Sequence, residues 1–520
     1  FYFPIPLVHY LSNSSYGVLI TEASGGYSRW RGIDVTRWQN DATLDNRGTW
    51  VYLTDRETGD LWFMGRQPSG TQPDKCEIRF FPHKAEFLKW DNDIFSRMEI
   101  LVAPEDDTEI RRINLSNNSD RARRLLVCSY AEVVIAPYAE DISHPSFNRL
   151  FIESEYLSEE NALLFRRRPR TAEEKEIFVV HMVTGSEANI YYQVDRDRFL
   201  GRGGSPGKPQ FLRYQKKAYS TGRIGTTLDP VMVAAIEIEL LPSESTRFCF
   251  ITAATHDRVA AKYMLKRYKS NSVIDEAFAS ADSFCRREMS RKNLTSMELE
   301  RIQLLLSVLV YPGYALRSGS DILSSNTLGQ QELWQFGISG DYPLLLVTVD
   351  TEDDTTLVYD LLRAHAFWRS RGLMIDFAIL NMKESSYEQD LQGQLQGLIS
   401  RTGGEKWMNR RGGLFLLRMD QMEKRERILL QTVAGAALDS RSGSLDRQLE
   451  RLGRRPVRLP GFVPTLQSEN LEETRPLERP EGLQFDNGTG GFSPDGREHL
   501  IYLDSENQTP APWINVIANP

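Results

Sequence analysis

The sequence has little cysteine. Its 520 residues include four, Cys76, Cys128, Cys249 and Cys285, and no two of them form a Cys-x-x-Cys pair. Zinc sites and disulfide frameworks are usually built from paired or numerous cysteines. The spacing therefore argues against both, and it fits a reducing compartment. We expect the chain in the cytoplasm, where any tether to the inner membrane would come from segments upstream of it.

Long apolar runs and an excess of positive charge are also missing. No stretch approaches the roughly 18 apolar residues that suggest a membrane-spanning helix, so we predict no membrane segment in this chain. The formal net charge is −8, whereas a nucleic-acid-binding surface needs a basic excess or stripe. We therefore predict no nucleic-acid partner. The chain opens at Phe1 without an initial Met or a signal peptide, and we interpret it as a fragment.

Familiar catalytic and metal-binding motifs are absent as well. The sequence contains no Gly-x-Ser-x-Gly, His-Glu-x-x-His or phosphate-binding loop. The acidic run at 105–107 is typical of a solvated loop, and His144 and His365 have no partner at metal-ligand spacing. We predict no metal site, no cofactor and no catalytic residue in this chain.

What is present is the composition of an ordinary globular protein, with 40% hydrophobic residues, and a length that suggests about two to four domains. Residues 1–255 alternate apolar and polar positions in short stretches, separated by turn signals such as Ser24-Gly25-Gly26. Many short strands of this kind predict a large antiparallel β-sandwich.

From residue 256 the apolar period changes to that of a helix. Helices are predicted over 256–288 and 296–310, and Pro312 ends the second. We interpret residues 256–336 as linker helices packed on a neighbouring domain.

Residues 337–440 alternate continuous apolar strands with helices, which predicts a small parallel α/β domain. The expected strands are 344–349, 375–380 and 414–417, and the expected helices are 355–371, 387–400 and 424–438. The acidic loop 350–354 after the first strand would repel phosphates, which argues against a dinucleotide site.

The remaining residues divide into two parts. Residues 441–480 are rich in Arg, Pro, Glu and Ser and are interpreted as a linker arm. Residues 481–520 again favour strands, and 510–519 repeat the pattern of 4–13, by a true repeat or by chance. We predict the truncated start of a second β-sandwich there, so the fold class is α+β and multidomain.

Several of these stretches resemble a known family. Residues 9–13, 25–30 and 35–38 resemble the opening of the glycosyltransferase family 36 sandwich, a module of glycoside hydrolase family 94. Residues 334–343, 387–392 and 487–492 are similar to family members of the cyclic β-1,2-glucan synthase type. The resemblance covers essentially the whole chain. It implies that the first sandwich is a supersandwich like galactose mutarotase, a carbohydrate-binding fold.

The resemblance also implies a reaction. Family 94 enzymes carry an (α/α)6 barrel in which an Asp acts as general acid while inorganic phosphate attacks the anomeric carbon, an inverting phosphorolysis. That barrel is not in this sequence, so no catalytic residue is carried over. We expect this fragment alone to be inactive, with phosphate as co-substrate of the intact enzyme and the barrel as the partner of this chain.

Three functions remain open at this point. The first is the accessory, N-terminal part of an enzyme that phosphorolyses β-1,2-glucan and controls its chain length. The second is the front half of a soluble 1,2-β-oligoglucan or cellobiose-type phosphorylase. The third is a stand-alone carbohydrate-binding scaffold. All three predict a β-glucan or oligosaccharide as the ligand.

Five residues are candidates for substrate binding: Trp30, Arg37, Trp38, Trp334 and Asp341. Indole faces stack on sugars, so Trp30 and Trp38, together with Trp50 and Trp62, could form a platform, although core packing is the commoner use of such residues.

The two charged candidates each have an ordinary structural alternative. Arg37 could grip a phosphate or carboxylate, or form a structural ion pair. Asp341 could face a cleft at the entrance of a strand, or cap a turn.

Overall fold

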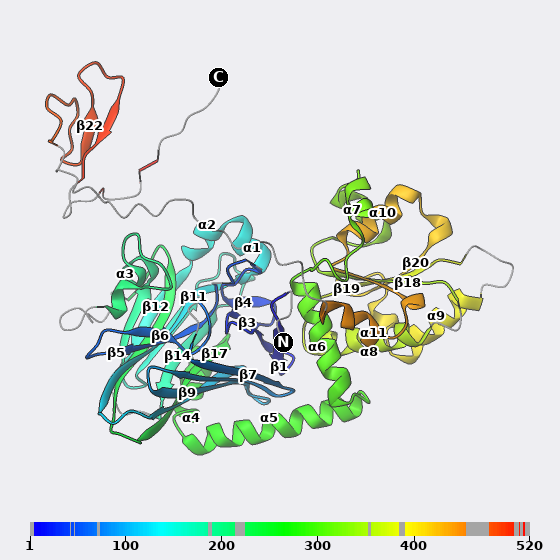
Figure 1. Ribbon diagram of the computed structural model, residues 1–520, viewed down its shortest axis with the longest axis horizontal. Coiled ribbons are helices and arrows are strands. Elements are labelled where there is room, and N and C mark those ends of the chain that lie inside the picture. The colour runs from blue at the N-terminus through cyan, green and yellow to red at the C-terminus, as the bar shows by residue number, and fades with distance from the viewer. Residues whose placement is uncertain are drawn as a thin grey trace. The chain divides into compact units, whose positions relative to one another are not determined.

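The computed structural model describes residues 5–41, 43–45, 47–69, 73–185, 190–213, 224–351, 355–383, 390–453, 478–503, 509 and 513–514 (Figure 1). The chain divides into a large unit, Phe1–Pro456, and a small one, Val457–Pro520. In the described ranges no helix is both long enough and apolar enough to cross a bilayer.

The predicted sandwich is present as two large antiparallel sheets. The nine-stranded sheet has the order β1(Val8–Ser12), β2(Tyr16–Thr21), β3(Gly26–Trp30), β4(Ile33–Thr36), β11(Arg123–Pro137), β16(Pro230–Leu240), β15(Tyr191–Asp195), with β5(Trp50–Asp55) paired to β11 and β6(Leu61–Phe63) to β5. The eight-stranded sheet has the order β12(Ile152–Leu157), β13(Ala162–Arg167), β14(Ile177–Thr184), β17(Ser245–Thr255), β10(Thr108–Asn117), β9(Ile94–Val102), β8(Lys84–Asp91), β7(Lys75–Phe81). The short helices α1(Tyr138–Ser143) and α2(Pro145–Arg149) lie between β11 and β12, and α3(Arg196–Leu200) lies between β15 and β16.

The core lies between the two sheets because every second residue of a strand points to the same face. Ile113 of β10 and Phe250 of β17 belong to the same buried cluster as Leu53 of β5 and Val127 of β11. The alternation that predicted the strands is therefore the pattern that fills the sandwich.

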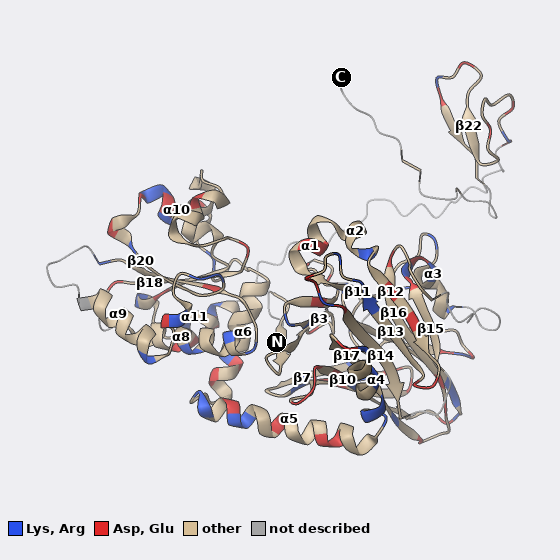
Figure 2. Ribbon diagram, turned by 180° about the vertical axis from the view of Figure 1, so that it is seen from behind, with Lys and Arg blue, Asp and Glu red and all other residues tan. Residues whose placement is uncertain are grey.

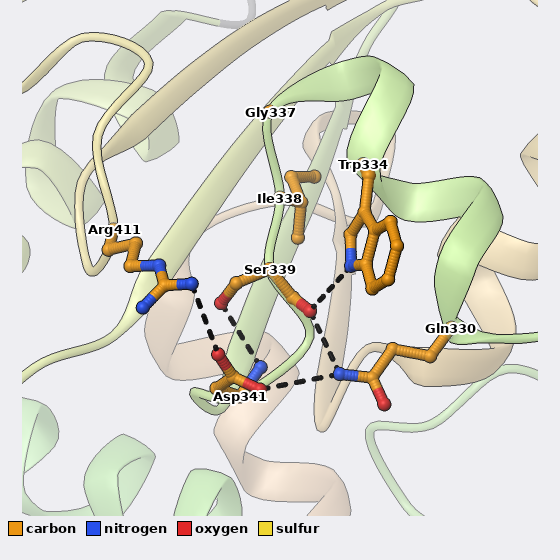
Figure 3. A pocket seen from close by; sticks show the side chains of 7 residues that line it. All are labelled: Gln330, Trp334, Gly337, Ile338, Ser339, Asp341 and Arg411. Atoms are coloured by element: carbon orange, nitrogen blue, oxygen red, sulfur yellow. Dashed lines mark hydrogen bonds and ion pairs between the residues drawn. The ribbon is translucent and has the colours of Figure 1, made fainter.

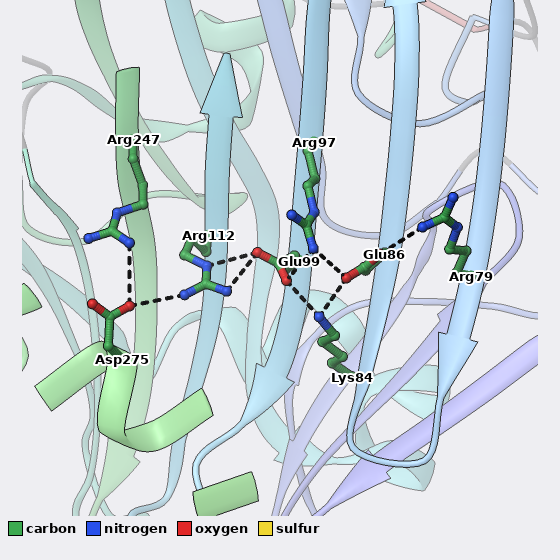
Figure 4. Close-up of polar contacts among 8 residues, drawn as sticks. All are labelled: Arg79, Lys84, Glu86, Arg97, Glu99, Arg112, Arg247 and Asp275. Atoms are coloured by element: carbon green, nitrogen blue, oxygen red, sulfur yellow. Dashed lines mark hydrogen bonds and ion pairs between the residues drawn. The ribbon is translucent and has the colours of Figure 1, made fainter. Parts of the chain in front are cut away.

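The outer face of the eight-stranded sheet is partly apolar and partly charged. Helices α4(Arg258–Arg267) and α5(Asn271–Arg291) cover its apolar part. Next to it runs a ladder of charges (Figure 4) in which Glu99, 1% exposed, binds Lys84 and Arg112. Arg112 also reaches Asp275 of α5, 3.1 Å away. Figure 2 shows basic and acidic residues interspersed along α5.

The region 256–336, predicted to hold linker helices, contains helices. The first predicted helix differs from the structure. The expected helix 256–288 is two helices, since α4 ends at Arg267 and α5 begins at Asn271. The second predicted helix is confirmed as α6(Ser296–Val310), which starts with a capping box between Thr295 and Glu298.

Helix α6 closes the open edge of the nine-stranded sheet. The Ser307 hydroxyl accepts a hydrogen bond of 2.9 Å from the Val8 amide, and one turn away Gln303 bonds both the amide and the carbonyl of Tyr10, each at 3.4 Å. An edge strand normally leaves such groups unpaired. Two side chains four residues apart on α6 thus replace a neighbouring strand.

The α/β domain is a four-stranded parallel sheet in the order β20(Leu414–Arg418), β19(Asp376–Asn381), β18(Leu344–Val349), β21(Ala436–Asp439). Helices α8(Thr355–Ser370) and α9(Asp390–Arg401) lie on one face and α10(Lys424–Val433) on the other (Figure 1). Short helices α7(Ser320–Ser325) and α11(Leu445–Leu449) complete it.

Two predictions about the secondary structure of this domain are wrong in part. The helix predicted over 424–438 ends at Val433, and residues 436–439 form β21. The sequence from Ala434 to Leu438 is apolar throughout, so it lacks the alternation that identifies strands. Residues 445–453, assigned to the arm, form α11 and a 3-10 turn whose Leu449 and Leu452 are buried in the core.

The small unit contains one described hairpin, β22(Gly490–Phe492) with β23(His499–Ile501). Most of the predicted second copy, residues 510–512 and 515–520, lies outside the described residues, as do 454–477 of the predicted arm.

Substituting Ser307→Ala should lower the free energy of unfolding by about 1–3 kcal/mol, because it leaves the buried Val8 amide without an acceptor. The measurement is the thermal unfolding midpoint by calorimetry. Ser290→Ala, at an exposed position of α5, is the matched control and should not lower the midpoint. Equal midpoints for the two variants would contradict the role of α6 at the sheet edge.

Candidate functional site

An open hollow of about 450 Å³ lies at the amino ends of strands in the parallel sheet. It is lined by Gln330, Trp334, Gly337, Ile338, Ser339, Asp341 and Arg411 (Figure 3). Six of these come from the 3-10 helix η2(Gln330–Phe336) and the loop leading into β18, and Arg411 comes from the loop before β20. We call it the Trp334 hollow.

The loop from Gly337 to Asp341 is folded back on η2 by hydrogen bonds. The indole nitrogen of Trp334 and the amide nitrogen of Gln330 both donate to the Ser339 carbonyl, at 3.3 and 2.9 Å. Gly337 ends the helix with a φ of 76°, a left-handed conformation that favours glycine. The walls of the hollow are therefore set by local backbone geometry.

Trp334 stands out among the tryptophans. All nine lie in the described residues, and Trp334, 60% exposed, is the one that is exposed rather than buried or half-buried. Its neighbours Leu333 and Ile338, each 1% exposed, anchor the segment in the domain core. The indole is thus exposed to solvent, while the residues next to it are anchored in the core.

Asp341 and Arg411 face each other across the hollow. A guanidinium nitrogen of Arg411 lies 3.9 Å from the Asp341 carboxylate, which also accepts a hydrogen bond of 3.4 Å from Gln330. Both charged side chains are mostly exposed. Such a long, solvated pair is weak, so both groups retain capacity for a ligand.

Two buried residues fasten the loop that carries Arg411. Asp376, at the start of β19, accepts a hydrogen bond of 2.7 Å from the Gly412 amide, and His365 Nε2 lies 3.2 Å from the Gly412 carbonyl. Burial lowers the pKa of His365 to about 4, so the ring is neutral, and its Nε2–H is shared between the Gly412 carbonyl and the Ile375 carbonyl, which lies 3.0 Å away. Burial, with the charge of Asp341 as a smaller cause, raises the pKa of Asp376 to about 6.

The predicted tryptophan platform is not formed on the sandwich surface. Trp30, Trp50 and Trp62 are each at most 3% exposed, and the Trp30 indole donates to Asp107 at 2.6 Å. Trp38 is half-buried, with rings of Tyr27 and Tyr311 beside it. These indoles occupy the packing positions that were the alternative reading, and their role in binding stays a prediction.

Arg37 is held in an ion-pair network. Its Nε and Nη2 donate to the two oxygens of Asp141 at 2.9 and 2.7 Å, and its Nη1 donates to Glu132 at 2.9 Å. Although burial opposes it, these carboxylates raise the pKa of Arg37 above its ordinary value. All three guanidinium nitrogens are thus engaged, as the structural alternative expects.

The structure therefore brings together two of the five predicted residues, Trp334 and Asp341, and adds Gln330 and Arg411. Sequence reasoning missed Arg411, although it stands in the turn Arg410–Gly413 directly before an apolar strand. Among the residues that the structure describes, no group of three His, Cys, Asp or Glu side chains could hold a metal ion. All four cysteines are free.

Comparison with known proteins adds the family context. Residues 2–271 match the family described as glycosyl hydrolase 94, supersandwich domain. The cyclic β-(1,2)-glucan synthase NdvB of Rhizobium meliloti (strain 1021) is 32% identical over 98% of this chain, which spans 18% of that protein. The N,N'-diacetylchitobiose phosphorylase of Vibrio proteolyticus is 24% identical over 53% of this chain, which spans 34% of that protein.

Solved structures resemble the chain more distantly. A bacterial glucoamylase complexed with acarbose matches 57% of this chain and 40% of its own, with 8% identity and a TM-score of 0.35. A protein of Escherichia coli K12, provisionally described as an aldose 1-epimerase, matches 48% of this chain and all of its own, with 9% identity and a TM-score of 0.30.

Substituting Asp376→Asn should stabilise the protein increasingly as pH rises from 4 to 7. The wild-type folded state must ionise a carboxyl whose pKa is about 6, above its unfolded value, so wild type loses stability across that window while the amide does not. The gap should reach at most about 3 kcal/mol. Urea unfolding of both proteins across the pH range measures it, and a pH-independent gap would contradict the assignment.

Proposed function

The chain belongs to glycosyl hydrolase family 94, and from this premise we propose that it is the accessory, substrate-handling part of an enzyme that acts on β-1,2-glucan. In this proposal the intact enzyme cleaves or forms glucosidic bonds by inverting phosphorolysis and so sets the length of the glucan. The (α/α)6 barrel that performs the chemistry is not part of this chain, which works as its partner in the cytoplasm.

One observation carries the choice of substrate. The similarity to the cyclic β-(1,2)-glucan synthase extends over 98% of the chain, so it includes the α/β domain as well as the sandwich. The phosphorylase of Vibrio proteolyticus matches over 53% of the chain, little more than the extent of the supersandwich match. The α/β domain therefore favours the synthase type over a soluble phosphorylase.

Two carboxyls with a raised pKa are placed in keeping with the proposal that this chain supplies no catalytic residue. Inverting glycoside cleavage needs a carboxylic acid with a raised pKa that reaches the leaving-group oxygen. Asp376 and Asp45 have pKa values raised to about 6 by burial. They are 0% and 8% exposed, and their oxygens bind Gly412 and Tyr311. Neither lines the Trp334 hollow.

What the chain's own residues contribute is binding and support. The Trp334 hollow offers exposed side chains to a ligand, and the joint between α6 and β1 fixes the α/β domain to the sandwich. The residues of this chain are therefore proposed to hold glucan near the barrel rather than to cleave it.

The purified chain, incubated with β-1,2-glucan and inorganic phosphate, should release no glucose 1-phosphate above a blank without enzyme, because it lacks the proton donor. A coupled assay measures the release: phosphoglucomutase converts glucose 1-phosphate to glucose 6-phosphate, and the oxidation of glucose 6-phosphate by its dehydrogenase reduces NADP+. Glucose 1-phosphate added to the same mixture should be recovered in full, which controls for its consumption. Release that depends on both glucan and phosphate would refute the accessory role.

A further inference from the structure

We propose that the Trp334 hollow is a binding site for a neutral glucan chain, located in the α/β domain and separate from the sandwich. Its lining residues are those described above, with Trp334, Asp341 and Arg411 as the main contacts. The preference for β-1,2 linkages rests on the proposed function; the site itself rests on the geometry that follows.

The first argument is the indole. A pyranose ring presents C–H groups on its faces, which pack on an aromatic face and exclude water there. Trp334 is 60% exposed and its Nε1 donates to the Ser339 carbonyl, so the ring is oriented before any ligand arrives. A platform fixed in advance loses little side-chain entropy on binding.

The second argument is the set of polar groups around that indole. Asp341 offers acceptors, Arg411 offers donors, and Gln330 offers both. Sugar hydroxyls both donate and accept, and they match such a mixed set. The groups are weakly engaged with one another, at 3.9 Å for Arg411 with Asp341 and 3.4 Å for Gln330 with Asp341, so a ligand can replace these contacts.

The charge and polarity of the hollow disfavour other ligand classes. Its one cation, Arg411, is offset by Asp341, whereas a phosphate site needs an excess of donors and positive charge. A protein-docking surface would have a larger apolar core, but beside Trp334 the lining side chains are polar except for Ile338, which is 1% exposed. A volume of about 450 Å³ lies in the usual range for small-molecule sites.

The third argument is the support beneath the site. Leu333 and Ile338 anchor its η2 side, while Asp376 and His365 fasten the Arg411 loop through Gly412. Two buried ionisable residues, Asp376 and His365, thus hold the loop in place, and the side chain that this loop contributes to the hollow, Arg411, is exposed. A merely solvated surface turn requires no such support.

Binding of linear glucohexaoses with β-1,2, β-1,3, β-1,4 and α-1,4 linkages to the whole chain, measured by calorimetry, tests the site. We expect the β-1,2 hexaose to bind, and Trp334→Ala to weaken it by about tenfold or more. Asp341→Asn and Arg411→Ala should each weaken it severalfold, while Trp334→Phe retains most of the affinity. Arg410→Ala and Gln331→Ala, exposed neighbours outside the hollow, are the matched controls and should bind like wild type.

The outcomes separate this site from the proposed function. Absence of binding to all four glucans at millimolar concentration overturns the site, as does binding that none of the three hollow variants weakens. Binding of another β-glucan in place of the β-1,2 hexaose, with the same loss in the variants, upholds the site and removes the β-1,2 preference. Thermal midpoints equal to wild type show that the variants are folded, and the surface position of all three side chains makes this the expected result.

Discussion

The closure of one sheet edge by a helix determines how this chain is organised. Strand β1 has β2 on one side and α6 on the other, where Gln303 and Ser307 satisfy the backbone groups of Tyr10 and Val8. Arg371 extends the joint, because it binds Glu288 of α5 at 2.7 Å while its carbonyl accepts a bond from Ser12 of β1. Strand β1, helix α6 and the α/β domain therefore share one buried cluster, which joins the α/β domain to the edge of the sandwich.

Charged side chains serve two different purposes in this molecule, and burial distinguishes them. Glu99 and Arg37 are almost fully buried, and each is bound by oppositely charged partners. Unpaired charges at such positions would cost several kcal/mol (roughly 3–5), so their pairing is a structural requirement. Asp341 and Arg411 are exposed and lie 3.9 Å apart, where the pair contributes little to stability. Their proximity contributes little to folding, in keeping with the ligand site proposed above.

The sequence predicted local structure well where a single period dominates. Strands 344–349 and 414–417 and helix 296–310 agree with β18, β20 and α6 within a residue. β21 was missed because Ala434-Gly435-Ala436-Ala437-Leu438 is apolar throughout and fits a helix or a buried strand equally. Only part of the hollow could be predicted from the sequence. Trp334 and Asp341 are close in sequence, but Arg411 is brought to them by the sheet order, in which β19 lies between β18 and β20.

The location of the hollow at the amino ends of the strands is unusual and has a physical reason. Open α/β sheets usually bind ligands at the carboxyl ends, where the strand order reverses, here between β18 and β21. At that position Arg441 bridges Asp350 and Asp439, at 3.1 and 3.0 Å. The guanidinium of Arg441 is therefore engaged by two carboxylates, an arrangement that disfavours the phosphates that such positions usually accept. The amino edge carries instead an exposed indole and a balanced Asp–Arg pair. A domain with this charge distribution is suited to a neutral ligand rather than a nucleotide, and it presents that ligand site on the edge opposite to the usual one.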